Sequence, residues 1–314
     1  MGNLRRFTFT NNFQPIVPSN FDITASWDRE SVYDTSSFIS FMQSKGLSNV
    51  IVTDFRLVSN KLTCNMTADG NSLMLNNNIT ILNKIGIIPN LLTLGLSYNS
   101  IEIFNPTVAL PSTLYSLDLT GNLITDFNPS IALPKDLSVL GLSYNLIEVF
   151  DPILTLPSTL TKLNLAGNLI TDFNPSTALP VNLEELSLVA NQIVNFNPLI
   201  RLPNQLQNLF LNNNKIVNFD PTIRLPNQLK ILDLYGNQII SFNPSFDMPY
   251  SLETLSLYDN LMTLQGYIDS EPWANDSLVK IINFSYINFS NNVNSIVGTP
   301  LQTILQNKNW LVFV

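Results

Sequence analysis

The sequence contains no histidine and a single cysteine, Cys64, among its 314 residues. Without histidine, the chain lacks the commonest general base and the commonest neutral metal ligand of proteins. One cysteine excludes an intrachain disulfide and a thiolate metal cluster, and we expect Cys64 to be a buried, inert thiol. The sequence also shows no nucleophile–base arrangement and no phosphate-binding loop. We therefore predict no catalytic residue, no metal site and no cofactor, and expect that the chain is not an enzyme.

Charged residues are also scarce, at 12% of the chain, and the net charge is −8. Nucleic acids and anionic membranes both attract basic surfaces, so we expect neither as a partner. No apolar run approaches the roughly 18 residues of a membrane span. The start, MGNLRRFTFTNNF, lacks the apolar segment of a secretory signal. The sequence as it stands predicts a protein that is made and released in a cytoplasm.

Asparagine is abundant instead, with 43 copies, and its positions reveal a repeat. Eight leucines from Leu91 to Leu252 fall 23 residues apart, and leucine recurs three and five residues after each of them. An isoleucine or methionine stands ten residues on, and seven units continue with Phe-Asn/Asp-Pro and Leu/Met-Pro. The unit reads LxxLxLxxNxIxxFNPxxxLPxx. The asparagines eight residues after each leucine are Asn99, Asn122, Asn145, Asn168, Asn191, Asn214, Asn237 and Asn260.

This unit resembles the leucine-rich repeat, over residues 91–264 directly. Its LPxxLxxLxLxxN portion is similar to the bacterial subclass of that family, with three extra residues on the return side. The resemblance implies a solenoid of stacked coils. It leaves the function open, because members of the family bind proteins, sugars and lipids alike.

The spacing favours the same fold on physical grounds. Leu-x-Leu has a period of two, which predicts a short strand with both leucines on one face. The next strand follows 23 residues later, too far for a tight hairpin, and the sequence contains no Asn-Gly turn. We therefore predict an α/β-type but mostly β solenoid of 23-residue units, with a parallel sheet on the concave face. The prolines predict little helix on the convex side.

Two columns of the repeat are expected to be structural. Each asparagine of the eight offers a donor and an acceptor, which can satisfy its own turn and the next coil. We interpret these residues as a ladder rather than a binding site. The phenylalanines of the Phe-Asn/Asp-Pro step are predicted to form a buried spine: Phe104, Phe127, Phe150, Phe173, Phe196, Phe219 and Phe242.

The ends of the solenoid need lids that cover its terminal coils. We predict an N-terminal cap over residues 1–69, the solenoid over 70–265 and a C-terminal cap over 266–314. In the N-terminal cap the alternation predicts a strand at residues 5–10 and one or two longer strands within 50–67. Residues 36–45, which Gly46 follows, are predicted to form a helix. Residues 70–90 are interpreted as a degenerate first coil, with Leu73, Leu75 and Asn78 in the repeat positions.

In the C-terminal cap, residues 266–280 are expected to be an irregular insertion that carries Trp273. Phe284, Ile287, Phe289 and Asn292 then restore the repeat once more. Thr299-Pro300 predicts the start of a short helix to about Asn307, because proline suits the first helical position. A last strand, WLVFV, is expected to close the end.

Side chains between the leucines of each strand are expected on the concave face, where a partner could bind. The candidate partner-binding residues are Tyr98, Tyr144, Phe210, Ile231, Tyr235 and Tyr258. Exposed aromatic residues on a rigid sheet make good interface anchors. The alternative is scatter, since isolated exposed apolar residues are common on protein surfaces.

The ends carry a second resemblance. The segments NVIVTDFRLVSNKLTCNMTADG at 49–70, GYIDSEPWANDS at 266–277 and NNVNSIVGTPLQTILQNKNWLVFV at 291–314 are similar to leucine-rich-repeat proteins of phages of marine and Bacteroidetes-type bacteria. This resemblance implies a structural or host-contacting protein of a tailed bacteriophage virion. Its partners would be other virion proteins or a host surface molecule, and an oligomeric arrangement in the assembly stays open. The alternative is a bacterial adhesin or effector, at the cell surface or secreted, that binds a host protein.

Overall fold

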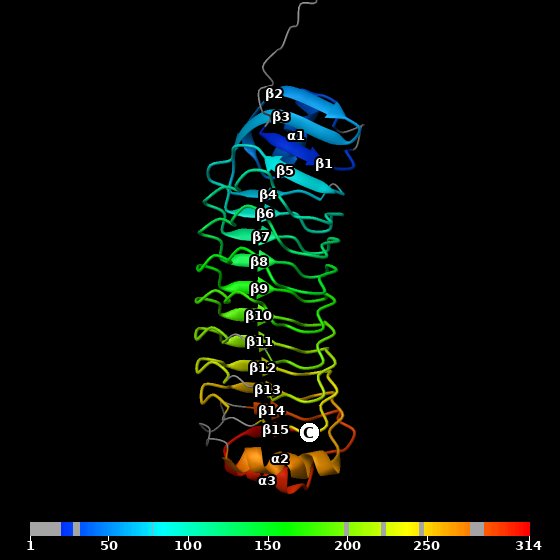
Figure 1. Ribbon diagram of the computed structural model, residues 1–314, viewed down its shortest axis with the longest axis vertical. Coiled ribbons are helices and arrows are strands. Elements are labelled where there is room, and N and C mark those ends of the chain that lie inside the picture. Colours follow the sequence, from blue (N-terminus) through cyan, green and yellow to red (C-terminus); the bar gives the residue numbers. More distant parts are fainter. Residues whose placement is uncertain are drawn as a thin grey trace, which may run out of the picture.

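The computed structural model describes residues 20–27, 32–76, 78–197, 201–220, 224–244, 248–276 and 286–314. They form one elongated molecule that contains two sheets (Figure 1). A small sheet with helix α1 closes the N-terminal end, and helices α2 and α3 lie at the other end (Figure 1). The strand expected at residues 5–10 lies outside the described residues.

Eleven parallel strands of three residues each make the long sheet between these ends. Neighbouring strands pair one coil apart, so that Leu117 lies between Leu94 and Leu140. The prediction of a mostly β, parallel solenoid with 23-residue units is confirmed. The strands are β4 (Ser72–Met74), β6 (Thr93–Gly95), β7 (Ser116–Asp118), β8 (Val139–Gly141), β9 (Lys162–Asn164), β10 (Glu185–Ser187), β11 (Asn208–Phe210), β12 (Ile231–Asp233), β13 (Thr254–Ser256), β14 (Tyr286–Asn288) and β15 (Leu311–Phe313).

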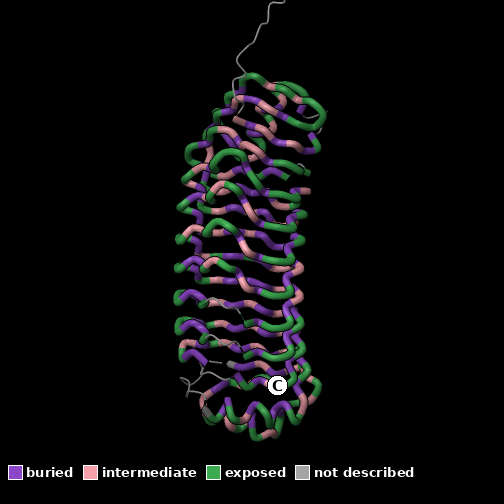
Figure 2. The backbone as a smooth tube through the Cα atoms, viewed as in Figure 1, coloured by how far each residue is buried: buried purple, intermediate pink, exposed green. Residues whose placement is uncertain are grey.

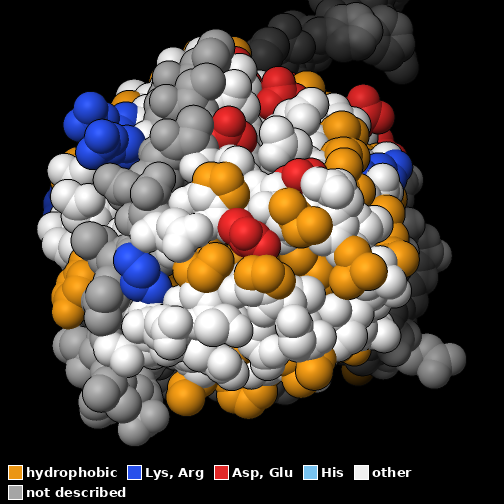
Figure 3. All heavy atoms as spheres, turned by 90° about the horizontal axis from the view of Figure 1, so that it is seen from below, with side chains coloured by type: hydrophobic (Ala, Val, Ile, Leu, Met, Phe, Trp, Pro, Cys, Tyr) orange, Lys and Arg blue, Asp and Glu red, His pale blue; other side chains and the backbone are white. Residues whose placement is uncertain are grey.

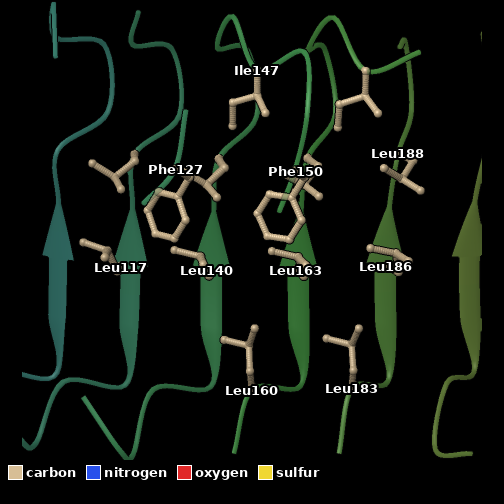
Figure 4. Packing of buried hydrophobic residues seen from close by; sticks show 14 of the residues in the cluster. Leu117, Phe127, Leu140, Ile147, Phe150, Leu160, Leu163, Leu183, Leu186 and Leu188 are labelled. Carbon is tan, nitrogen blue, oxygen red and sulfur yellow. The ribbon is translucent and has the colours of Figure 1, made fainter. Parts of the chain in front are cut away.

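Leucine and phenylalanine columns fill the interior of the coils. The leucines of the repeat are buried in every coil, and the same buried positions recur along the whole tube (Figure 2). The phenylalanine spine is also present, since five neighbouring ring pairs stack with centroids 6.1–6.5 Å apart and planes within 12° of parallel. Figure 4 shows Phe127 beside Phe150, above the row that contains Leu140 and Leu163. Each coil therefore covers the apolar interior of the next.

The asparagine ladder is present in all eight coils, and every one of its side chains is buried. In a typical coil, the Asn145 amide donates to the carbonyls of Leu142 and Leu119, each at 3.0 Å. Its carbonyl accepts the N–H of Ile124 at 3.0 Å. The second coil that each asparagine serves is thus the preceding one, whereas the sequence reasoning expected the next. The ladder ties neighbouring turns together, and it does not face a ligand.

Two further polar columns, which sequence reasoning missed, hold the coils on their outer side. The residue before proline in the Phe-Asn/Asp-Pro step accepts a backbone N–H from the next coil: Asn105 from Ser130, and Asp151 from Ser176, at 2.9 and 2.7 Å. In three coils a hydroxyl before the strand also bonds the preceding coil: Thr113, Thr159 and Ser251 donate to the carbonyls of Leu91, Leu137 and Leu229 at 2.8, 2.9 and 2.6 Å. Within the described residues no helix lies between the strands of the repeat units, in agreement with the expected helix-poor convex side.

The N-terminal sheet is antiparallel, in the order β2-β3-β1-β5. Ser59 and Asn60 join β2 and β3 in a two-residue hairpin, and both have positive φ, as such tight turns require. Helix α1 packs against this sheet through Phe38 and Met42, and confirms the helix expected at 36–45. The elements are β1 (Phe21–Thr24), α1 (Thr35–Ser44), β2 (Ser48–Val58), β3 (Lys61–Asp69) and β5 (Ile81–Ile85).

The first coil interlocks the two sheets. Leu73 and Leu75 are buried in the repeat positions, as predicted, but β5 of the same segment returns to the N-terminal sheet. The prediction for Asn78 is wrong. Its side chain is exposed and bonds Ser26 and Ser100 instead of pointing inward. In the repeat one residue separates the asparagine from the buried isoleucine, whereas here the buried Ile79 follows Asn78 directly. The domain boundaries at residues 69 and 266 stay predictions.

At the C-terminal end, the expectation of an irregular insertion at 266–280 is wrong over its described part. Helix α2 (Leu264–Asp276) occupies it, in spite of Pro272. Tyr267, Ser270, Trp273 and Ala274 are buried at helical spacing, and this buried face outweighs the breaker residues. Trp273 packs edge-on against Phe242, with centroids 4.8 Å apart, so α2 covers the end of the phenylalanine spine.

The remaining C-terminal predictions that fall on described residues are confirmed. Ile287 and Phe289 are buried, and Asn292 continues the ladder by accepting the Met262 N–H at 3.1 Å. Helix α3 (Pro300–Asn307) begins after the N-cap Thr299 and packs against α2, and β15 then pairs with β14. Phe284 lies outside the described residues. Figure 3 shows this end of the molecule, where hydrophobic side chains are interspersed with a few acidic ones.

Candidate functional site

Four of the predicted partner-binding residues lie together on neighbouring strands. Phe210 and Ile231 stand on β11 and β12, and Tyr235 and Tyr258 follow the ends of β12 and β13. The rings of Tyr235 and Tyr258 are in contact, with centroids 5.1 Å apart and planes tilted by 35°. All four side chains are partly exposed. We call this group the sheet patch.

A carboxylate stands between the aromatic residues of the sheet patch. Asp233 pairs with Phe210 across the two strands and accepts the N–H of Tyr235 at 3.1 Å. Burial raises the pKa of Asp233, although hydrogen bonds from the Tyr235 N–H and the Ser256 hydroxyl act in the opposite direction. The sheet patch therefore combines apolar area with a partly desolvated negative charge, which would favour a partner with a cationic group at this point.

Tyr98 and Tyr144, the other two predicted residues, do not join the sheet patch. They belong to the coils of β6 and β8, at the turns where these strands end. The coil of β6 lies five coils from that of β11, or about 24 Å at the usual strand spacing. With side chains 74% and 64% exposed, these tyrosines are among the most exposed large apolar residues of the chain. The sequence prediction of one surface thus separates into two.

The backbone at both tyrosines is left-handed, with φ of 55° and 53°. This conformation costs roughly 1–2 kcal/mol for a residue with a side chain, and it is uncommon for a bulky one. It belongs to a turn that recurs in each coil, in which the N–H of the same residue donates to a carbonyl of the next coil, as Tyr98 does to Thr120 at 2.8 Å. The equivalent residues of the other coils all share positive φ: Gly121, Gly167, Ala190, Asn213, Gly236, Asp259 and Asn291.

Each tyrosine ring rests on a glycine of the next coil. A Cβ atom added to Gly121 would lie 2.8 Å from the Tyr98 ring, and one added to Gly167 would lie 2.6 Å from the Tyr144 ring. The alternation of tyrosine and glycine therefore has a steric reason, which sequence reasoning missed. Its signal is the column of glycine, asparagine and aspartate directly before the ladder asparagine, since these residues tolerate positive φ.

The part of the chain that the structure describes contains no group of three or more potential metal-binding side chains. Asp118 and Asp233 stand five coils apart and cannot act as a pair of catalytic carboxylates. Cys64 is buried in β3, and burial raises the pKa of its thiol to about 12, which leaves it unreactive. None of the described helices is long and apolar enough to cross a membrane.

The stacked 23-residue coils, the leucine columns and the buried asparagine ladder together decide the architecture. The chain has a leucine-rich-repeat fold. No protein-family model matches the chain, and no curated protein sequence matches it.

Solved structures of leucine-rich-repeat proteins are similar to it. YopM of Yersinia pestis, a leucine-rich effector protein, is 24% identical over 70% of this chain and 60% of that chain, with a TM-score of 0.48. YopM of Yersinia enterocolitica WA-314 is 20% identical over 70% and 60%, with a TM-score of 0.33. A leucine-rich-repeat protein of Leptospira interrogans is 21% identical over 59% of each chain, with a TM-score of 0.34. This chain thus spans about 60% of the length of the structures that it matches.

Proposed function

We propose that the chain is a non-catalytic binding protein of a tailed bacteriophage virion. In this role the rigid solenoid contacts another virion protein or a surface molecule of the host cell. The observation that carries the binding role is the sheet patch, in which Phe210, Ile231, Tyr235 and Tyr258 gather on adjoining coils. Aromatic residues that cluster on a rigid surface are typical anchors of protein interfaces.

The virion setting is supported by the ends of the chain. The segments at 49–70, 266–277 and 291–314, which are similar to phage-encoded proteins, include much of the two lids: β2, β3, α2, α3 and β15. A lid must fit the coil that it covers, whereas the repeat itself can be shared by unrelated proteins. The similarity of the lids therefore says more about the setting than the similarity of the repeat.

Mass spectrometry of purified phage particles from the source genome tests the setting. We expect peptides of this chain in the particles, at a constant ratio to the major capsid protein. Recovery of the chain only from the culture medium or from the bacterial envelope would refute the virion role and favour an adhesin or effector.

Substitutions in the sheet patch test the binding role. Phe210→Ser and Tyr235→Thr introduce residues that other coils carry at these positions, Ser187 and Thr120, so the fold should be kept. We expect the double variant to lose about tenfold or more in affinity for the partner, because aromatic anchors contribute most of the binding energy and the variant removes two of them. Binding is measured by pull-down of the partner from particle lysates and by titration of the purified pair.

Asn164→Ser, at the same strand position in β9, is the matched control. It should bind like the wild type. Equal binding by the control and the double variant would remove the sheet patch as the binding surface.

A further inference from the structure

The two exposed tyrosines at the strand ends form a second site, separate from the sheet patch. Tyr98 and Tyr144 stand two coils apart, which at about 4.8 Å per strand places them about 10 Å from each other. Between them lies Gly121, which has no side chain. The ring of Tyr98 lies against Gly121 and the ring of Tyr144 against Gly167, so each ring is supported by the next coil. We call these two residues the tyrosine pair.

Both tyrosine side chains are available to bind an external partner. Within the described residues no hydrogen bond of either phenolic hydroxyl is found, although their backbone N–H groups are bonded. A tyrosine that is largely exposed, with a fixed ring and a free hydroxyl, offers apolar area and a donor at little cost in conformational entropy. The left-handed backbone at both positions disfavours tyrosine, so the fold alone does not explain why these two coils carry it.

The spacing of the tyrosine pair selects among extended polymers. A polyproline II helix repeats every three residues and rises about 3.1 Å per residue, which gives about 9.3 Å per turn. Residues i and i+3 of such a helix lie on one side and match the pair. In a β-strand, residues three apart point to opposite faces and cannot both contact the rings. An α-helix satisfies its own backbone groups, so its carbonyls do not accept from the tyrosine hydroxyls.

We propose that the tyrosine pair binds a proline-rich peptide segment in the polyproline II conformation. Proline rings pack on the two tyrosine rings, and the hydroxyls donate to peptide carbonyls, which have no internal hydrogen bonds in this helix. Glu102 and Glu148, both exposed, follow the two tyrosines by four residues. Lysine or arginine beside the proline segment therefore strengthens the encounter, and added salt weakens it.

Fluorescence anisotropy on the full chain tests this proposal with a labelled peptide of nine prolines between two lysines. The decisive variant is the double substitution Tyr98→Gly and Tyr144→Gly. Glycine accepts the left-handed backbone, as Gly121 and Gly167 show, so the melting temperature should not fall. We expect saturable binding by the wild type and a loss of about tenfold or more in the double variant.

Tyr115→Ala is the matched control, since Tyr115 is exposed but lies before a strand and outside the pair. It should bind the peptide like the wild type. Three probes decide the class of ligand: a glycine–serine peptide of equal length, an alanine-rich helical peptide of about 20 residues and a linear β-1,4-linked glucan. Each should fail to bind.

No saturable binding of the proline peptide, or equal binding by the double variant, would overturn the proposal. Binding of the glucan or the helical peptide in its place, lost in the same variant, would assign the pair to that ligand class instead. The sheet patch takes no part in this experiment, so the two proposals can fail independently.

Discussion

Asn145 and Asn128 stand in neighbouring units of the repeat but act in different surroundings. The amide of Asn145 is buried and satisfies backbone groups of two coils at once. Asn128 accepts the N–H of Ile153 at 2.8 Å near the surface, where water can replace it. The free energy that a residue contributes therefore follows its position in the coil rather than its type.

Replacement of a ladder asparagine should be costly. Asn145→Ala leaves the Ile124 N–H without its partner. It also removes one of the two amide donors of the Leu119 and Leu142 carbonyls, which keep the amides of Asn122 and Asn168. We expect the free energy of unfolding to fall by about 2–4 kcal/mol, because the unsatisfied N–H costs about 1–3 kcal/mol and each lost hydrogen bond about 1 kcal/mol. Urea unfolding followed by circular dichroism measures the change.

Asn128→Ala serves as the comparison and should cost less than about 1 kcal/mol. If the two variants lose the same free energy, the ladder does not carry the stability that its burial implies.

Among the elements, the two lids differ in how far the sequence predicts them. Helix α1 has the signals that local rules use: the N-cap Asp34, a hydrophobic face and Gly46 after its end. Helix α2 contains Gly266 and Pro272, which local rules count as breakers. This helix forms because of its tertiary contacts. A side chain at Gly266 would meet the carbonyl of Ile240, and Ser270 donates to the Gly266 carbonyl and accepts the Phe242 N–H.

The same contrast applies to the candidate surfaces. Period-two alternation placed Phe210, Ile231, Tyr235 and Tyr258 on one face, and the structure places them together. The count of 23-residue units already places Tyr98 and Tyr144 in other coils, but it does not show that these two residues stand in a turn with positive φ. A backbone angle is only weakly predictable from sequence. Here the signal is that Gly121 and Gly167 stand at the positions equivalent to Tyr98 and Tyr144 in the coils that follow them.

The cap of α1 predicts a pH dependence. The Ser37 N–H donates to the Asp34 carboxylate at 2.8 Å, and this bond lowers the pKa of Asp34 from its ordinary value of 3.8. A lowered pKa means that the stabilisation is present above the ordinary value and is lost as the pH falls through the folded-state value. We expect Asp34→Ala to lower the melting temperature at neutral pH, and the difference from wild type to shrink in acid. Thermal unfolding at a series of pH values measures both.

Asp34→Asn keeps the capping acceptor without the charge and should stay close to the wild type at neutral pH. A difference between Asp34→Ala and wild type that is the same at every pH would contradict this role of the carboxylate.

On the scale of the whole molecule, the first coils repeat in pairs, because a coil with an exposed tyrosine is followed by a coil with a glycine that the tyrosine ring contacts. The segments 95–106 and 141–152 are nearly identical, as are 121–134 and 167–180. Each tyrosine ring requires a residue without Cβ in the coil after it. A change in length by two coils keeps this order, whereas some changes by one coil break it.

Two deletions of one coil each test this requirement. Removal of residues 99–121 places Tyr98 over Tyr144, whereas removal of 122–144 keeps Tyr98 over Gly121. We expect the first deletion to be the less stable by about 1 kcal/mol or more, since overpacking has a cost of this size. In a chain of this length that is about 1–2 °C in melting temperature. Equal melting temperatures would show that the ring contact with glycine does not constrain the order of coils.

The backward reach of the asparagine ladder gives the solenoid a polarity. At the N-terminal end the first ladder residue, Asn99, needs a neighbour that offers a carbonyl and an N–H, and Leu75 and Ile79 supply them. At the C-terminal end the last full coil needs a side-chain amide, and Asn292 supplies it. The two termini are chemically unlike, so neither lid can be exchanged for the other. New coils can be inserted in the interior, but a reversed cap would seal neither end.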